Sequence, residues 1–270
     1  MKKYELEDIC VVLVLYNINY KDSLSLSKLL IKNKIKIYVC DNSTKDYGNI
    51  ELEKYSNVKY INMGGNKGLA KAYNKAVNII PHDKLIILLD DDSVLPENFF
   101  DSILDEVSKT NADIYIPIVE DGNGILSPCK NRNNCFFRYN DIHEIDNDFS
   151  AINSGLVIKS KVFEDYRYDE NMFLDYIDHA FFNDMKKKKK KFKIMYRVKI
   201  RQNFSLNTDT KESSIIRLKI LKKDLKYFYR NQKRYYYWTI FKKKIHLCLI
   251  HKSIKFIFIY TIKIYTVKDI

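Results

Sequence analysis

Three consecutive carboxylates are the residues of this sequence with the clearest potential for chemistry. Asp90, Asp91 and Asp92 come directly after Lys84–Leu89, which has the pattern of a buried strand. Their mutual repulsion costs stability unless a cation lies among them. Carboxylate oxygens suit Mg²⁺ or Mn²⁺, and such an ion would bridge the two phosphates of a nucleotide diphosphate and offset the charge of that leaving group. The alternative is an acidic turn that caps the following helix.

A glycine-rich turn, Gly64-Gly65-Asn66-Lys67-Gly68, precedes a segment with helical spacing. Backbone N–H groups at the start of a helix can bind an anion such as a phosphate. The turn is therefore a second candidate for contact with a phosphorylated ligand. The alternative is an ordinary turn, in which the glycines only supply the backbone conformation.

Strand and helix patterns alternate through the first half of the chain, and they determine where these residues lie. The predicted strands are Ile9–Leu15, Ile35–Cys40, Val58–Ile61, Lys84–Leu89 and Asp113–Val119, and the predicted helices are Asp22–Asn33, Gly68–Ile79 and Pro96–Lys109. This alternation predicts an α/β fold with a mostly parallel sheet and helices on both faces, in which ligands bind beyond the carboxyl ends of the strands. We therefore expect the polar residues that follow the strands to gather along one edge of the sheet.

The second half of the chain has weaker patterns. Residues 122–149 have the composition of a loop, and we interpret them as a flank of the active site. Ala151–Ile158 and Phe192–Ile200 predict strands, and Asp175–Lys188 predicts a helix. These elements complete a domain of residues 1–210.

Residues 211–270 are predicted to form a basic, aromatic-rich helical extension. Its first part is amphipathic, with an apolar face made by Leu218, Leu221, Leu225 and Phe228. The later part, Tyr235–Ile270, mixes aromatic and aliphatic residues with lysine, which is typical of a segment at a membrane interface. A homo-oligomer interface built from the same aromatic residues is the alternative.

Charge and cysteine content limit the location and the partners of the chain. The 47 Lys and Arg residues exceed the 34 Asp and Glu residues, and the net charge of +13 favours anionic partners. Nucleic acid is not expected, because the acidic cluster would lie in the cleft where phosphates run and no nucleic-acid motif is present.

Five cysteines without disulfide or zinc spacing indicate a reducing cytoplasm. Ile9–Tyr16 and Ile254–Val267 are too short to cross a bilayer, so neither export nor a membrane span is expected.

The order of these features resembles the family 2 inverting glycosyltransferases of the GT-A fold, and within them the rhamnosyltransferase-like branch. The resemblance extends over residues 8–205. The segments that carry it are Tyr16-Asn17, Val39-Cys40-Asp41-Asn42-Ser43, Asn66-Lys67-Gly68-Leu69-Ala70 with Asn74, Leu89-Asp90-Asp91-Asp92-Ser93, Asn153-Ser154-Gly155 and Met172-Phe173-Leu174-Asp175-Tyr176-Ile177-Asp178.

The resemblance implies a site for a nucleotide-sugar donor. Tyr16 and Asp41 would lie around the base, and Asp90 would meet the ribose or the sugar. Asp92 would hold the metal together with Asp90. The resemblance also implies Asn66, Lys67 and Gly68 along the ribose and pyrophosphate, and Asn153, Ser154 and Gly155 on the acceptor side. Asn17, Asn42 and Asp91 are further substrate-binding candidates.

The resemblance also implies a general base. Asp178 aligns with the carboxylate that takes the proton of the acceptor hydroxyl while that oxygen attacks the anomeric carbon from the face opposite the nucleotide, which inverts the configuration. Asp175, three residues earlier and predicted on the same helical face, is the competing candidate. For either residue the alternative is a carboxylate that only stabilises a helix N-terminus.

Two departures from the family pattern affect the expected contacts. Ala180 and Asn183 stand where this branch usually has an acidic residue and an arginine, so acceptor contacts are expected to differ. The late histidine of the family is missing, so Arg201 would stabilise the diphosphate, or the metal would keep an additional water.

The sequence therefore predicts an inverting, metal-dependent hexosyltransferase. Its donor would be a UDP- or dTDP-linked sugar, and its acceptor a hydroxyl of a cell-surface glycan or lipid-linked molecule at the inner face of the cytoplasmic membrane. Two alternatives stay open. A sugar-nucleotide nucleotidyltransferase should have a glycine-rich, arginine-containing loop in place of Tyr16-Asn17-Ile18-Asn19. A catalytically inactive glycan-binding or scaffold protein is the other.

Overall fold

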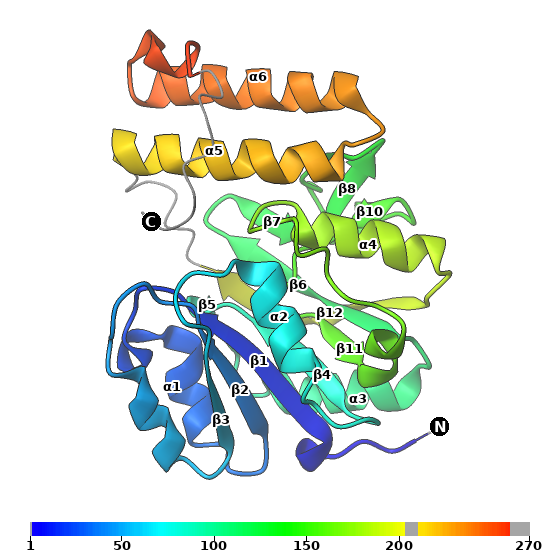
Figure 1. Ribbon diagram of the computed structural model, residues 1–270. Coiled ribbons are helices and arrows are strands. Elements are labelled where there is room, and N and C mark those ends of the chain that lie inside the picture. Colours follow the sequence, from blue (N-terminus) through cyan, green and yellow to red (C-terminus); the bar gives the residue numbers. More distant parts are fainter. Residues whose placement is uncertain (1, 203–209, 260–270) are drawn as a thin grey trace. The chain divides into compact units, whose positions relative to one another are not determined.

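The computed structural model describes residues 2–202 and 210–259, which fall into two compact units (Figure 1). The described part of the first unit comprises residues 2–168 and 178–202, and that of the second comprises residues 169–177 and 210–259. The first unit therefore contains most of the segments that the sequence singles out.

A large sheet forms the centre of the first unit. Among the described residues it has nine strands in the order β3-β2-β1-β4-β11-β6-β12-β5, with β7 paired to β6. The strands are β1 (Ile9–Leu15), β2 (Lys36–Asp41), β3 (Val58–Asn62), β4 (Leu85–Leu89), β5 (Ser93–Val94), β6 (Ile114–Asp121), β7 (Gly124–Ser127), β11 (Val157–Lys159) and β12 (Phe192–Gln202).

The strand directions confirm the predicted α/β architecture. β1 is parallel to β2 and β4, β2 is parallel to β3, and β6 is parallel to β12. β11 lies between β4 and β6 and is antiparallel to both, so β6 and β12 run in the same direction as β1 to β4. Leu15 lies opposite Asp41, and Leu13 lies opposite Leu89. The segments that follow β1, β2 and β4 therefore leave the sheet at the same edge.

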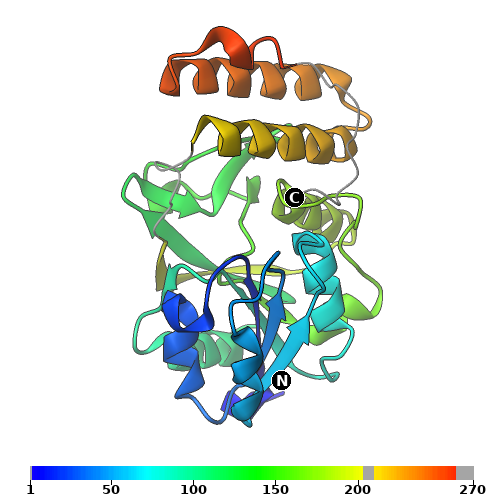
Figure 2. The same cartoon turned by 60° about the vertical axis from the view of Figure 1, so that its left-hand side comes forward.

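Helices cover both faces of this sheet. The helices of the first unit are α1 (Leu24–Leu30), α2 (Leu69–Val77), α3 (Phe99–Lys109) and α4 (Ile177–Lys187). Val11 of β1 packs in one buried cluster with Leu26 of α1 and Ile103 of α3. On the other face, the Cys40 thiol donates a hydrogen bond to the carbonyl of Ala72 in α2, at 3.3 Å. α1 and α2 accordingly lie on opposite sides of the strands (Figure 2).

The prediction of a loop over residues 122–149 is wrong. This segment contains β7 and a second, three-stranded sheet of β8 (Cys129–Arg132), β9 (Cys135–Phe137) and β10 (Phe149–Ser150). The strands are short and β8 reads Cys-Lys-Asn-Arg, so no apolar alternation marks them in the sequence. Antiparallel pairing with neighbouring strands forms them instead.

The predicted strand Ala151–Ile158 is also largely wrong. Only Val157–Lys159 is a strand, and residues 153–155 form a bend and turn before it. Gly155 has a φ of +80°, which is outside the extended region and is accessible mainly to glycine. Asn153-Ser154-Gly155 therefore lies on a turn and not on a strand.

The second unit is built around two helices, α5 (Lys211–Phe228) and α6 (Lys233–Ile250). The predicted apolar face of the first helix is buried: Leu218, Leu221 and Leu225 pack in one cluster with residues of α6. Residues 169–177 belong to the same unit, and the ring of Tyr176 lies 5.0 Å from that of Phe228.

Within the described residues, no helix has the length and apolar character needed to span a membrane. Residues 260–270 of the predicted membrane-interface segment lie outside the described part of the chain.

Candidate functional site

The backbone of the acidic loop after β4 is held by the start of α1. The Ser23 hydroxyl donates to the carbonyl of Asp91 at 2.9 Å. The Ser25 hydroxyl donates to the carbonyls of Asp90 and Ser93, the latter at 3.0 Å. These serines were not predicted as part of the site. They give the loop a defined shape, which a loop that presents charged side chains to a ligand requires.

The carboxylates of Asp90 and Asp92 converge on one side chain, that of Gln202 at the end of β12. Gln202 Nε2 donates to Asp90 Oδ2 at 2.8 Å and to Asp92 Oδ1 at 3.3 Å. β12 pairs with β5, so that Gln202 lies opposite Ser93. The pairing of these two strands therefore brings Gln202 to the acidic loop.

Burial and mutual repulsion make the ionised form of this cluster costly. Burial, followed by the neighbouring Asp92 carboxylate, raises the pKa of Asp90 to about 7. The same two causes raise the pKa of Asp91 to about 6, and burial raises the pKa of Asp92. A cation beside Asp90 and Asp92 would relieve this cost.

The residues present suit a hard divalent ion that is shared with a ligand. In the described part of the chain, no group of three or more His, Cys, Asp or Glu side chains is arranged to hold a metal. Mg²⁺ in proteins is commonly held by only one or two carboxylates together with substrate phosphates and water. Asp90 and Asp92 therefore fit a metal that binds together with a diphosphate.

We expect Asp90→Asn to stabilise the metal-free protein at pH 8 by on the order of 2 kcal/mol. Because the pKa of Asp90 is about 7 in the folded chain and about 4 when unfolded, the folded state binds more protons. This carboxyl therefore costs stability as the pH rises between those values, and the advantage of asparagine should shrink as the pH falls below 7. Urea unfolding in EDTA at pH 8 and pH 5 measures both. If Asp90→Asn changes the free energy of unfolding equally at the two pH values, or stabilises the protein more at pH 5 than at pH 8, the raised pKa of Asp90 is contradicted.

Ser154 and Gly155 lie against the acidic loop. The hydroxyls of Ser154 and Ser93 are 2.9 Å apart, and Ser154 also hydrogen-bonds the side chain of Asp90. The Gly155 N–H donates to the carbonyl of Leu88 at 2.6 Å, and a Cβ at Gly155 would collide with the side chain of Ile200. The turn can therefore pack against β12 in this way only with glycine at this position, where φ is also positive.

Asn153 is buried beside these residues, with 5% of its surface exposed. Among the described residues, its Oδ1 atom has no hydrogen-bond partner. A buried acceptor without a partner costs stability and is common where a ligand completes the contacts. Contact of Asn153 with a substrate stays a prediction, which this unused acceptor supports.

The loops after β1 and β2 are tied together by Asn17. Its side-chain oxygen accepts from the N–H of Thr44 at 2.8 Å, and its own N–H donates to the Ser43 hydroxyl at 3.0 Å. The adjacent Tyr16 has 47% of its surface exposed. Its ring is therefore accessible at the edge of the sheet where a base was predicted to bind.

Asp41 is engaged by the protein itself. Asn49 and Tyr60 both donate to its Oδ2 atom at 3.0 Å, and the Ser43 N–H donates to Oδ1 at 3.1 Å. Asp41 therefore stabilises the loop that follows β2. Its contact with a nucleotide base stays a prediction.

Two asparagines organise the glycine-rich turn. Asn42 Nδ2 donates to Asn66 Oδ1, and Asn42 Oδ1 accepts from the N–H of Lys67 at 2.8 Å. The N–H of Gly68, the residue before α2, donates to Asn66 Oδ1 at 3.2 Å. The N–H groups of Lys67 and Gly68 are thus already satisfied within the protein, and contact of this turn with an anion stays a prediction.

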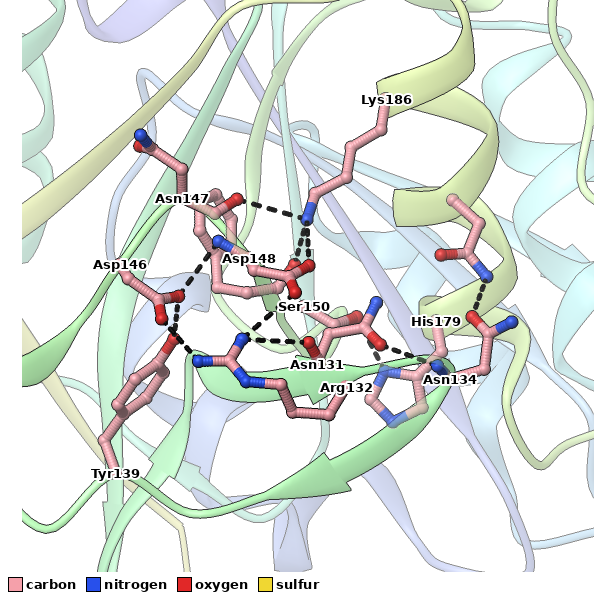
Figure 3. A network of polar contacts seen from close by, with 12 residues as sticks. Asn131, Arg132, Asn134, Tyr139, Asp146, Asn147, Asp148, Ser150, His179 and Lys186 are labelled. Atoms are coloured by element: carbon pink, nitrogen blue, oxygen red, sulfur yellow. Dashed lines mark hydrogen bonds and ion pairs between the residues drawn. The ribbon is translucent and has the colours of Figure 1, made fainter. Parts of the chain in front are cut away.

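Asp178 lies in the first turn of α4, where its Oδ1 atom accepts the N–H of His179 at 2.7 Å. The helix is anchored to the small sheet by polar contacts (Figure 3). His179 Nδ1 is 2.8 Å from the Ser150 hydroxyl, its ring stacks on Phe136 at 3.5 Å, and Lys186 donates to the carbonyl of Phe149. These contacts fix the helix that carries Asp178.

The small sheet is itself braced by charged groups. Arg132 of β8 donates to Asp146 at 2.7 Å and to Asp148 at 3.0 Å, and the Tyr139 hydroxyl donates to Asp146 (Figure 3). The guanidinium of Arg132 holds the pKa of Asp146 at about 2. The segment interpreted as a flank of the active site is therefore an ordered support for α4.

The expectation that Asp175 shares a helical face with Asp178 is wrong. α4 begins at Ile177, and Tyr176 has a φ of +64°, which interrupts helical geometry between the two aspartates. In the second unit, Asp175 Oδ1 accepts from Arg217 at 3.1 Å. Asp175 is therefore held in an ion pair with α5.

A carboxylate that the sequence did not single out holds the same segment. Asp224 of α5 is fully buried and accepts the backbone N–H groups of Phe173, Leu174 and Asp175 at 2.7 to 2.8 Å. Burial raises its pKa, while the three donors favour its ionised form. Asp224 thus fixes the backbone of residues 173–175 within the second unit.

Arg201 was predicted to stabilise the diphosphate in place of the late histidine. It is exposed on β12, and side chains of successive strand residues point to opposite faces. Gln202 is therefore the residue of this strand that reaches Asp90 and Asp92. A role of Arg201 with the diphosphate stays a prediction.

Comparison with known proteins identifies relatives of this chain. The sequence profile described as "Glycosyl transferase family 2" matches residues 11–167. The dTDP-rhamnosyl transferase RfbF of Shigella flexneri is 27% identical over 179 residues, which cover 63% of this chain. The chain spans 60% of the length of that relative.

Solved structures share the fold at low sequence identity. GalNAc-T7, crystallised with UDP, GalNAc and Mn²⁺, matches 83% of this chain and 51% of its own with a TM-score of 0.56 and 13% identity. S. aureus TarS 1-349 matches 84% of this chain and 73% of its own, with a TM-score of 0.52 and 14% identity. TarS 1-349 in complex with UDP-GlcNAc gives a TM-score of 0.54 and 13% identity, over 81% of this chain and 66% of its own. These similarities concern the fold.

Proposed function

Because this chain belongs to glycosyl transferase family 2 and has the GT-A fold, we propose that it transfers a sugar from a nucleotide diphosphate sugar to a hydroxyl group with inversion at the anomeric carbon. The observation that carries the proposal is the convergence of Asp90 and Asp92 at the carboxyl edge of the sheet, with Ser154 beside them. Next to Ser154, the side-chain oxygen of Asn153 has no hydrogen-bond partner in the described part of the chain. The similarity to a dTDP-rhamnosyl transferase favours dTDP-rhamnose as the donor, and UDP-sugars are the alternative.

We assign the metal to Asp90 and Asp92, with Mg²⁺ or Mn²⁺ as the ion. The presence of Mn²⁺ and UDP in the GalNAc-T7 structure supports this assignment. When bound, the ion would neutralise the charge that develops on the nucleotide diphosphate as it leaves. We further assign contact with the base to Tyr16, whose ring is exposed, and contact with the acceptor to Asn153 and Ser154.

We assign the general base to Asp178, which takes the proton of the acceptor hydroxyl while that oxygen forms the new glycosidic bond and the diphosphate oxygen leaves with the electron pair of the old one. The anchoring of α4 by His179 and Lys186 holds this carboxylate in place. Asp175 is the weaker candidate, since Arg217 is paired with it. The match to glycosyl transferase family 2 argues against the nucleotidyltransferase alternative.

The acceptor that we propose is a cell-surface glycan or a lipid-linked molecule, reached from the inner face of the cytoplasmic membrane. Support comes from α6, where Tyr237, Trp238 and Phe241 are 67%, 52% and 55% exposed. Lys242 lies over the Trp238 ring at 5.7 Å, and Arg234 lines the same surface depression. Aromatic rings with adjacent cations are typical of contact with anionic lipid headgroups.

We expect the double substitution Trp238→Ala and Phe241→Ala to weaken binding to anionic vesicles by at least about tenfold, because it removes the apolar anchors and leaves the cations. Co-sedimentation with phosphatidylglycerol vesicles measures the effect. Phe137→Ala, which removes an equally exposed aromatic residue of β9, is the matched control. Unchanged vesicle binding with a change in oligomeric state would show instead that the aromatic residues form an interface between copies of the chain.

A thermal-shift screen of nucleotide diphosphate sugars with Mn²⁺ tests the proposed function. A ligand at about 100 times its Kd stabilises the folded state by about 2.7 kcal/mol, so the cognate donor should raise the melting temperature clearly. Stabilisation by nucleoside triphosphates with sugar 1-phosphates, and not by nucleotide sugars, would favour the nucleotidyltransferase. Stabilisation by free glycans alone would favour an inactive glycan-binding protein.

A further inference from the structure

Gln202 occupies the point where the two proposed metal-binding carboxylates meet. Its Nε2 atom lies within hydrogen-bonding distance of Asp90 Oδ2 and Asp92 Oδ1, at 2.8 and 3.3 Å. The side chain is buried, with 7% of its surface exposed. β12 holds it there through the pairing of Gln202 with Ser93.

The other end of this amide is not satisfied. Gln202 Oε1 is buried and has no hydrogen-bond partner among the described residues. A buried carbonyl oxygen without a partner costs about 1 to 3 kcal/mol. The amide therefore satisfies its donors with the carboxylates, while its acceptor is unused within residues 2–202 and 210–259.

A half-turn of the terminal amide exchanges the positions of its nitrogen and its oxygen. Without a cation, an oxygen that faced Asp90 and Asp92 would be repelled by both carboxylates. With a divalent cation among them, the same oxygen would be a neutral ligand of the kind that hard cations bind in proteins. The preferred orientation of the amide thus depends on the presence of the ion.

We propose that Gln202 is a ligand of the divalent ion held by Asp90 and Asp92, and that its amide turns from hydrogen-bond donor to metal ligand when the ion binds. This inference rests on the proposed metal site. Two carboxylate oxygens and one amide oxygen leave positions for phosphate oxygens of the donor and for water. The competing view of the same geometry is that Gln202 is a permanent donor, which competes with the cation for the two carboxylates.

The two views predict opposite effects of Gln202→Leu on Mn²⁺ affinity. If Gln202 is a ligand, we expect Mn²⁺ to bind about 10- to 100-fold more weakly. If Gln202 is a competing donor, its removal should leave Mn²⁺ affinity unchanged or increase it. The measurement is the electron paramagnetic resonance signal of free Mn²⁺, titrated with protein in the presence of UDP or dTDP and corrected for the Mn²⁺–nucleotide complex in buffer.

Two further variants complete the experiment. Gln202→Glu keeps an oxygen at the same distance from the backbone, so we expect it to bind Mn²⁺ at least as tightly as the wild type. Lys199→Leu, on the same strand and paired with Glu120, is the matched control and should not change Mn²⁺ affinity. Mn²⁺ affinity of Gln202→Leu equal to or above that of the wild type overturns the ligand role alone. Failure of the wild type to bind Mn²⁺, with or without nucleotide, overturns both this inference and the proposed metal site.

Discussion

Replacing Asp178 with asparagine is expected to lower turnover by about two to four orders of magnitude while leaving the affinity for the nucleotide sugar nearly unchanged. Asparagine has almost the same shape, and its Oδ1 atom can still accept the N–H of His179, so α4 should remain intact. What it loses is the ability to take the proton of the acceptor hydroxyl. Release of nucleotide diphosphate measures turnover, and calorimetry with the donor measures affinity.

Asp175→Asn is the matched control for this prediction. Its ion pair with Arg217 is lost, so we expect a modest loss of stability and little loss of turnover. If Asp175→Asn instead abolishes turnover and Asp178→Asn does not, the assignment of the base is wrong. Loss of donor affinity in Asp178→Asn would show that Asp178 binds the donor and not the acceptor.

Replacing Asp92 with asparagine is expected to abolish both transfer and the Mn²⁺-dependent part of donor binding. The substitution removes a ligand charge from a loop whose backbone is held independently by Ser23 and Ser25, so the fold should be retained. Calorimetric titration with UDP and dTDP, with and without Mn²⁺, separates metal-dependent from metal-independent binding. Asp101→Asn, on the exposed side of α3, is the control. Equal Mn²⁺-dependent binding in Asp92→Asn and the wild type would remove Asp92 from the metal site.

The first half of the fold could be predicted because its strands are continuous apolar runs. Val11, Val39 and Ile87 lie in such runs and are fully buried, and strands covered by helices on both faces have this composition. The short strands β8 and β10 could not be predicted, because their residues are mostly polar and pairing with distant residues forms them. The start of α4 was misplaced because the positive φ of Tyr176 leaves no mark in the sequence.

The strand pattern alone could indicate site residues only where they follow strands, whereas Asp178 was indicated by the family resemblance. Asp90 and Asp92 were found from the strand pattern, whereas the serines of α1 were not, since nothing in a helix N-terminus indicates which distant loop it will contact. Gln202 carries one available signal: it comes two residues after the predicted strand Phe192–Ile200, and ligands bind beyond the carboxyl ends of such strands. Asp224 carries another, since it is an acidic residue beside the apolar positions of a lysine-rich helix and needs a partner when that face is buried.

The most direct measurement of the central claim is the release of nucleotide diphosphate from the donor identified by thermal shift, compared with Mn²⁺ present, after EDTA, and in the Asp178→Asn variant. A metal-dependent inverting transferase of this kind should release nucleotide diphosphate with Mn²⁺, lose that activity in EDTA and regain it when Mn²⁺ is restored. Asp178→Asn should be nearly inactive under all three conditions. Release that is equal in EDTA and in Mn²⁺, or equal in Asp178→Asn and the wild type, would contradict the proposed mechanism.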